Sequence, residues 1–267
     1  GPPELADVAF QVGLALPVEL PRVWITATGA LDLDGPVIVG ILNMTPDSFS
    51  DGGRLPTVAA AVARAEELLD GGATMLDVGG ESTRPGRPAP VPADEEIARV
   101  APVVGALRER WPTVPLSVDT VKAETARAVL AAGASAINDV SGLRLDPAMA
   151  GVVAQAGAGV VVMHSRGTVA TMASHDEAEY GGDVVGGVLV ELRQAVERAT
   201  VAGVSVDRIV VDPGFGFSKT ADQNILLADQ LPALHALGRP ILVGPSRKRF
   251  LGAVTGRDLP DRDRATA

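Results

Sequence analysis

Short apolar runs alternate with amphipathic segments along most of this chain. Apolar runs of about five residues occur at 37–42, 75–78, 115–119, 136–140, 159–163, 208–212 and 240–244. Between them, apolar residues recur every three or four positions, which predicts helices over 57–70, 93–110, 122–132, 184–201 and 224–237. Strands that are aliphatic throughout are typical of a parallel sheet covered by helices. We therefore expect an α/β fold built from repeated strand–helix units.

Such units build either a closed (β/α)8 TIM barrel or a doubly wound open sheet. The turn after 37–42 lacks the G-x-G-x-x-G pattern of dinucleotide-binding open sheets, which favours the barrel. Residues 22–33, with Gly29 at the turn, predict a β-hairpin. We expect residues 1–36 to form an N-terminal extension whose hairpin plugs the barrel floor, and residues 37–267 to form one barrel domain.

The strand count bears on how complete this barrel is. Only seven strands are predicted, and the stretch 252–267 that follows them is polar. A barrel needs an eighth strand to close its edges. We therefore expect the eighth strand and the last helix to be missing from this chain, which leaves the barrel incomplete at its C-terminal end.

The composition narrows the functional classes. The chain has 23 Lys and Arg against 33 Asp and Glu, so its net charge is −10. A field of this sign repels phosphates and argues against nucleic-acid and anionic-membrane partners. The chain contains no cysteine, which excludes disulfides and thiolate chemistry. No apolar run is long enough to span a membrane, and we expect a cytoplasmic protein.

Polar residues recur where the predicted strands end, which is where barrel enzymes carry their active sites. These residues are Asn43, Asp77, Asp119, Asn138, Asp139, Met163, His164, Asp212, Ser246, Arg247 and Lys248. Any one of them could be an ordinary cap, but carboxylates and amides recur at the same depth on successive strands. A carboxylate accepts two parallel hydrogen bonds from a ring N–H and a neighbouring amino group. The pattern therefore indicates a site for a flat, nitrogen-rich heterocycle.

Four further segments add to this picture. Arg247, Lys248 and Arg249 open a predicted helix after the last strand, a frequent phosphate site in barrels, although a solvated helix start would look the same. The glycine- and proline-rich loops 44–53 and 79–86 follow strands on the same side and are predicted lids. The segment 212–220 ends in Lys219-Thr220 but does not match the phosphate-binding P-loop pattern.

These motifs together resemble the dihydropteroate synthase family. The matching segments are 40–53, 76–86, 117–120, 137–142, 163–164, 212–219 and 244–248, in family order. The resemblance implies a homodimeric barrel transferase of folate biosynthesis. It would join p-aminobenzoate to 6-hydroxymethyl-7,8-dihydropterin diphosphate, giving 7,8-dihydropteroate and diphosphate, by ionisation of the pterin C–O bond followed by attack of the amine. It would also be a target of sulfonamides.

The resemblance also implies roles for individual residues. Asp119, Asn138, Asp212 and Lys248 would hold the pterin, and Met163, Gly244 and Arg247 are further substrate-binding candidates. Phe49, Thr83, Pro85, Phe217 and Ser246 would lie near p-aminobenzoate. Asn43 would contact Mg²⁺ bound to the diphosphate, and Arg84 would close over the substrates with the lids. Lys248, Arg84 and Asp119 are the expected catalytic residues.

The chain departs from the family at some positions. No Arg-x-His motif, which the family carries on its final strand, follows Lys248, and Arg249 stands where many members have a small residue. The missing motif leaves a non-catalytic pterin-binding paralogue open as an alternative. A pterin-binding methyltransferase domain is a second alternative, because it shares the barrel and the pterin pocket. His164, His175 and His235 lack metal-ligand spacing, and His164 is expected to be structural.

Overall fold

Six parallel strands form the centre of the computed structural model, which describes residues 19–45, 57–81, 90–246 and 248–256. Each strand pairs with the next along the chain, in the order β3-β4-β5-β6-β7-β8. The strands are β3 (Val39–Asn43), β4 (Met75–Gly79), β5 (Leu116–Asp119), β6 (Ala136–Asp139), β7 (Gly159–Met163) and β8 (Ile209–Asp212). Parallel strands in sequential order, each followed by a helix, are the arrangement of a TIM barrel, and this confirms the predicted fold class.

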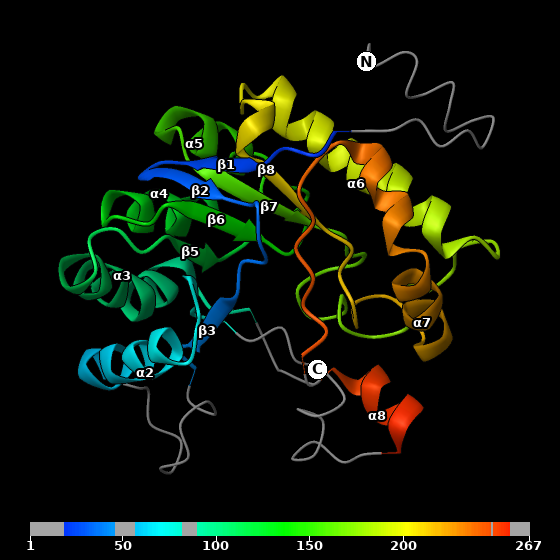
Figure 1. Ribbon diagram of the computed structural model, residues 1–267, viewed down its shortest axis with the longest axis horizontal. Coiled ribbons are helices and arrows are strands. Elements are labelled where there is room, and N and C mark those ends of the chain that lie inside the picture. Colours follow the sequence, from blue (N-terminus) through cyan, green and yellow to red (C-terminus); the bar gives the residue numbers. More distant parts are fainter. Residues whose placement is uncertain (1–18, 46–56, 82–89, 247, 257–267) are drawn as a thin grey trace.

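The helices lie outside the strands (Figure 1). They are α2 (Val58–Asp70), α3 (Ala93–Arg110), α4 (Ala123–Ala131), α5 (Met149–Ala156), α6 (Val184–Val201), α7 (Ala221–Asp229) and α8 (Arg249–Thr255). Local signals set their starts: the Thr57 hydroxyl accepts from the Ala60 amide before α2, and Thr220 and Gln223 form a capping box before α7. No helix of the described ranges is long and apolar enough to cross a membrane.

Strand alternation separates the main core from the barrel interior. On β4, Leu76 and Val78 belong to the large core between strands and helices, whereas Met75 and Asp77 point to the interior. Because side chains alternate along every strand, the same rule sends Asp119 and Asp212 inward at the carboxyl ends of β5 and β8. The interior is therefore apolar near the amino ends of the strands and acidic near their carboxyl ends.

The amino ends of the strands are covered by the predicted hairpin. Strand β1 (Val23–Thr26) pairs antiparallel with β2 (Gly29–Asp32), and Trp24 is buried against inward residues that include Met75 and Val210. The Trp24 indole N–H donates to the Arg208 carbonyl at 2.8 Å. A Cβ at Gly159 would lie 2.9 Å from the Trp24 ring, so this glycine makes room for it. The predicted hairpin is therefore present, and its Trp24 packs on the inward residues at this end of the barrel.

The predicted strand 240–244 is wrong in extent. It forms only a bridge between Ile241 and Val211, with the Leu242 amide donating to the Val211 carbonyl at 2.8 Å. Pro240 has no N–H to give to a ladder, which limits the pairing. Within the described residues, no strand of the barrel sheet follows β8. Residues 257–267 lie outside the described residues.

One predicted helix differs in type. The helix predicted at 224–237 is α7 followed by a 3₁₀ helix, η2 (Leu231–Leu237), because Pro232 cannot continue an α-helix. Helix α3, in contrast, begins at Ala93 as predicted and continues through Pro102. The Asp146 carboxylate accepts from the Ala148 amide just before α5 and from the Ala123 amide at the start of α4.

Candidate active site

Four of the predicted pterin-binding positions meet on one rim of the barrel. The register pairs Asp119 with Asn138 between β5 and β6, and Met163 with Asp212 between β7 and β8. All four side chains have inward positions at or next to the carboxyl ends of their strands. The parallel register thus gathers two carboxylates, an amide and a thioether at the mouth of the barrel, as the sequence predicted.

A hydrogen bond to Asp77 holds the Asn138 side chain in one orientation. Its amide nitrogen donates to the Asp77 carboxylate at 3.4 Å, and the Ser117 hydroxyl donates to the other oxygen of Asp77. The Asn138 amide oxygen is buried and has no hydrogen-bond partner within the described residues. A buried carbonyl oxygen without a partner is rare. This oxygen is therefore ready to accept a hydrogen bond from a ligand.

The pKa values of the two rim carboxylates, Asp119 and Asp212, are both raised. Burial raises the pKa of Asp212 to about 6, although the Gly214 amide at 2.7 Å and the charges of Lys248 and Lys219 oppose the shift. Burial also raises the pKa of Asp119, and the neighbouring carboxylates of Asp77, Glu96 and Asp139 raise it further. Carboxylates in this state gain more than exposed ones from a ligand that donates hydrogen bonds.

Lys248 supplies the cation that faces these carboxylates. Its Nζ lies 4.1 Å from the centroid of the Phe217 ring, and Asp212 and Asp119 both favour its charged form, although burial lowers its pKa overall. A Cβ at Gly216 would lie 3.0 Å from the Lys248 side chain, and Gly216 has a φ of 77°. Only glycine lets the loop after β8 pass this close to the lysine in that conformation.

Asn43 has the exposed position at the end of β3 that a metal contact needs. Its amide oxygen and the Asp119 carboxylate lie 3.3 and 4.0 Å from where a Cβ on Gly79 would be, so both face the space above this glycine. Within the described ranges, no group of three or more His, Cys, Asp or Glu side chains could hold a metal ion. A single amide oxygen therefore fits Mg²⁺ only if phosphate and water supply the other ligands.

The remaining predicted residues fall into two groups. Gly244 is half-buried and Ser246 is exposed in the segment before Lys248. Phe217 is buried under Lys248. Phe49, Thr83, Arg84, Pro85 and Arg247 lie outside the described residues. Arg249 donates from its guanidinium to the Ala173 carbonyl at 3.0 Å, in the loop after β7.

Two residues that contact this site were absent from the predicted set. Asp77 was noted only as a strand-end residue, yet it orients Asn138. Lys219 was considered only for a P-loop, yet its buried Nζ lies 3.0 Å from the carbonyl oxygen of Phe217. Lysine is almost never fully buried without partners, and only three lysines occur in the chain. Their rarity was the one signal in the sequence.

Comparisons with known proteins show which proteins this chain is similar to. Residues 39–267 match the family described as pterin binding enzyme. A dihydropteroate synthase of Synechocystis sp. is 45% identical over 224 residues, which cover 84% of this chain and 75% of that protein. The solved structure of Xanthomonas albilineans dihydropteroate synthase with 7,8-dihydropteroate is 44% identical, with a TM-score of 0.77 over 88% of this chain and 82% of that one. The Yersinia pestis enzyme, solved with a sulfonamide drug, is 39% identical, with a TM-score of 0.81 over 90% and 85%.

Proposed function

This chain belongs to the dihydropteroate synthase family of pterin-binding enzymes, and on that basis we propose what its own residues do. It is a transferase that joins p-aminobenzoate to 6-hydroxymethyl-7,8-dihydropterin diphosphate and releases diphosphate. The observation that carries this function is the Asn138 oxygen between the Asp119 and Asp212 carboxylates, which has no partner among the described residues. This is an acceptor-rich slot for the N–H groups of a pterin.

The pterin is bound by groups of matched polarity. The guanidine-like edge of the ring donates two parallel hydrogen bonds to a carboxylate, for which Asp212 is the candidate, while Asn138 and Asp119 bind the remaining ring atoms. Lys248 lies over the rim and donates to a ring acceptor. Met163 and Gly244 complete the walls. Binding relieves the burial cost of the carboxylates, because each gains a donor that water no longer provides.

The reaction follows an ionisation-first route. The C–O bond between the pterin methylene and the diphosphate breaks, and the electron pair leaves with the diphosphate. The cationic pterin that results is stabilised by the Asp119 and Asp212 carboxylates. The p-aminobenzoate nitrogen then forms the new C–N bond and loses a proton. Alignment of the amine is sufficient, so no nucleophilic side chain of the protein is needed.

Mg²⁺ is the metal that fits the donor set at Asn43. When bound with the substrate, it would neutralise charge on the departing diphosphate, and Asn43 would be its ligand from this chain. Arg84, Arg247 and the lid loops would surround the diphosphate and the p-aminobenzoate. Phe49, Thr83, Pro85, Phe217 and Ser246 would line the p-aminobenzoate position, where sulfonamides would compete.

We infer three further properties. Residues 1–36 form an extension with the capping hairpin, and 37–267 form the pterin-binding barrel. The protein acts in the cytoplasm on small molecules. It forms a homodimer through its outer helices, which is supported by exposed apolar side chains on α6, α7 and α8, namely Val190, Val201, Ile225, Leu226 and Val254.

The experiment that tests the function is detection of 7,8-dihydropteroate by mass spectrometry after incubation with both substrates and Mg²⁺. Product that depends on p-aminobenzoate and is reduced by a sulfonamide supports the proposal. Tight pterin binding without product would instead indicate the non-catalytic paralogue.

A further inference from the structure

Lys219 is a fully buried lysine whose three hydrogen-bond partners are all acceptors. Its Nζ lies 2.9 Å from His164 Nδ1, 3.1 Å from the Gly214 carbonyl oxygen and 3.0 Å from the Phe217 carbonyl oxygen. An ammonium group has three N–H donors and no acceptor, so this set satisfies the charged form completely. Burial lowers the pKa of Lys219 to about 7, while the Asp212 carboxylate acts in the opposite direction.

His164 links Lys219 to helix α6. Since His164 Nδ1 accepts from Lys219, its Nε2 carries the proton and donates to Glu191 on α6 at 3.1 Å. Burial and the Lys219 charge lower the pKa of His164 to about 4, so the ring is neutral at pH 7. Arg166 completes the chain with hydrogen bonds to Glu191. Burial raises the pKa of Glu191, but the bonds from His164 and Arg166 outweigh this and lower it to about 2.

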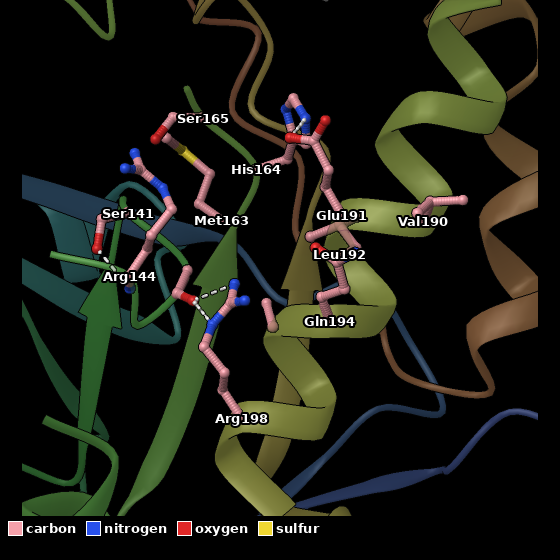
Figure 2. A pocket seen from close by; sticks show the side chains of 12 residues that line it. Ser141, Arg144, Met163, His164, Ser165, Val190, Glu191, Leu192, Gln194 and Arg198 are labelled. Carbon is pink, nitrogen blue, oxygen red and sulfur yellow. Dashed lines mark hydrogen bonds and ion pairs between the residues drawn. The ribbon is translucent and has the colours of Figure 1, made fainter. Parts of the chain in front are cut away.

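This hydrogen-bonded network reaches solvent at Glu191. A cavity of about 320 Å³ on the flank of the barrel is lined by Glu191, His164 and Arg198, among others. Figure 2 shows the His164 ring and the Glu191 carboxylate facing one another at this cavity, with Arg198 bound to the loop after β6. The Glu191 side chain is 32% exposed, whereas that of His164 is 1% exposed. The buried residues of this network, His164 and Lys219, therefore lie between the cavity and the barrel mouth.

At the inner end of this network, Lys219 holds the loop that supports the pterin site. Lys219 binds the carbonyls at both ends of the segment 214–217. Within this segment, the Gly214 amide donates to Asp212, Gly216 lies against the Lys248 side chain, and the Phe217 ring lies under the Lys248 ammonium. These contacts to Asp212 and Lys248 therefore depend on the segment 214–217, and the Lys219 ammonium binds both ends of that segment.

We propose that Lys219 is a positioning residue of the pterin site, held by His164 and Glu191, and that it anchors the loop 214–217 against Asp212 and Lys248. The proposal rests on the proposed pterin binding. The charged and titratable groups facing Lys219 are His164 after β7, Asp212 on β8, Glu191 on α6, Arg166 after His164, and Lys248 before α8. Lys219 does not contact substrate and acts through the loop 214–217 and through the field at Asp212.

The first test is Lys219→Met, with binding of 6-hydroxymethyl-7,8-dihydropterin measured by calorimetry from pH 5 to 8. We expect about tenfold weaker binding, or about 1.4 kcal/mol, because the loop 214–217 loses the ammonium that anchors both of its ends. The fall in affinity on acidification should also move to higher pH, because Asp212 loses a cation that lowers its pKa. Arg208→Met is the matched control, since Arg208 also binds two backbone carbonyls, those of Thr26 and Gly157, at the opposite end of the barrel. The same affinity and pH profile in Lys219→Met and the wild type would overturn the proposal.

A second pair of variants applies even if Lys219→Met does not fold. His164→Asn keeps an acceptor near the Nδ1 position and loses the donor to Glu191, whereas His164→Gln keeps a donor near Nε2 and loses the acceptor for Lys219. We expect His164→Gln to bind the pterin several-fold more weakly than His164→Asn. Equal affinities, or the reverse order, would overturn the role of Lys219. If the wild type did not bind the pterin at all, the proposed function itself would fail, which is a distinguishable result.

Discussion

The Lys248 ammonium lies 4.1 Å from the centroid of the Phe217 ring, at the rim where Asp119 and Asp212 end their strands. A cation over an aromatic face keeps part of its stabilisation when water is removed. Lys248 can therefore lose its hydration in a site that must be dry for chemistry. The two carboxylates favour its charge, and the ring fixes its position.

Lys248→Met should retain the fold and lose most turnover. The change removes the cation that faces Asp119 and Asp212 while keeping the aliphatic chain that packs on Gly216. We expect kcat/KM for the pterin substrate to fall about hundredfold, equivalent to about 2.7 kcal/mol. Steady-state kinetics check this, with Arg110→Met, an exposed cation on α3 paired with Glu66, as the control. Near-normal turnover in Lys248→Met would contradict the assigned role.

Asn138→Leu should weaken pterin binding. The variant loses the free acceptor and also the amide N–H that binds Asp77. We expect about ten- to hundredfold weaker binding in calorimetry. Asp77→Asn is an informative partner, because it leaves Asn138 in place but disturbs its orientation. A loss in Asn138→Leu no larger than in Asp77→Asn would argue that the amide does not bind the ligand directly.

Asp212→Asn should stabilise the ligand-free protein while removing pterin binding. The folded-state pKa of Asp212 is about 6, above its usual value near 4, so the folded state binds more protons between these values and stability falls as pH rises through that window. At pH 7 the cost is on the order of 1–3 kcal/mol. The amide oxygen introduced by the substitution can still accept from the Gly214 amide, as the Asp212 carboxylate does. Thermal unfolding at pH 7 should show a Tm above that of the wild type, and at pH 4 the difference should shrink.

The order of bond breaking and bond making can be measured by positional isotope exchange. With ¹⁸O in the bridge between pterin and diphosphate, ionisation lets the label move to non-bridging oxygens before recombination. We expect this exchange with Mg²⁺ in the absence of p-aminobenzoate. If the label stayed in the bridge of the recovered substrate although the enzyme turned over with the amine, a concerted displacement would replace the ionisation-first route.

Much of the fold follows from periodicity alone. The bounds of α3, α6 and β7 agree with the predicted ranges because the apolar positions of these segments keep one period from end to end, even across Pro102 in α3. The run 240–244 has the same composition as the true strands, but within the described residues it has only β8 as a neighbour. Strand formation depends on pairing partners that a local pattern does not contain.

The residues at the rim of the site could be predicted from the sequence, whereas the residues that hold them in place could not. Strand ends in a barrel converge by geometry, so Asp119, Asn138 and Asp212 could be grouped from sequence. Lys219 could not, because its partners are two loop carbonyls and a histidine 55 residues earlier in the chain. Such contacts exist only after the loop after β8 has folded over the end of β7.

The central claim is that this barrel mouth joins a pterin to p-aminobenzoate. The most direct measurement is the release of diphosphate with 6-hydroxymethyl-7,8-dihydropterin diphosphate, p-aminobenzoate and Mg²⁺, for the wild type and Lys248→Met side by side. We predict release by the wild type that saturates in both substrates, and little release by Lys248→Met. Saturable pterin binding by the wild type with no release of diphosphate would contradict this claim.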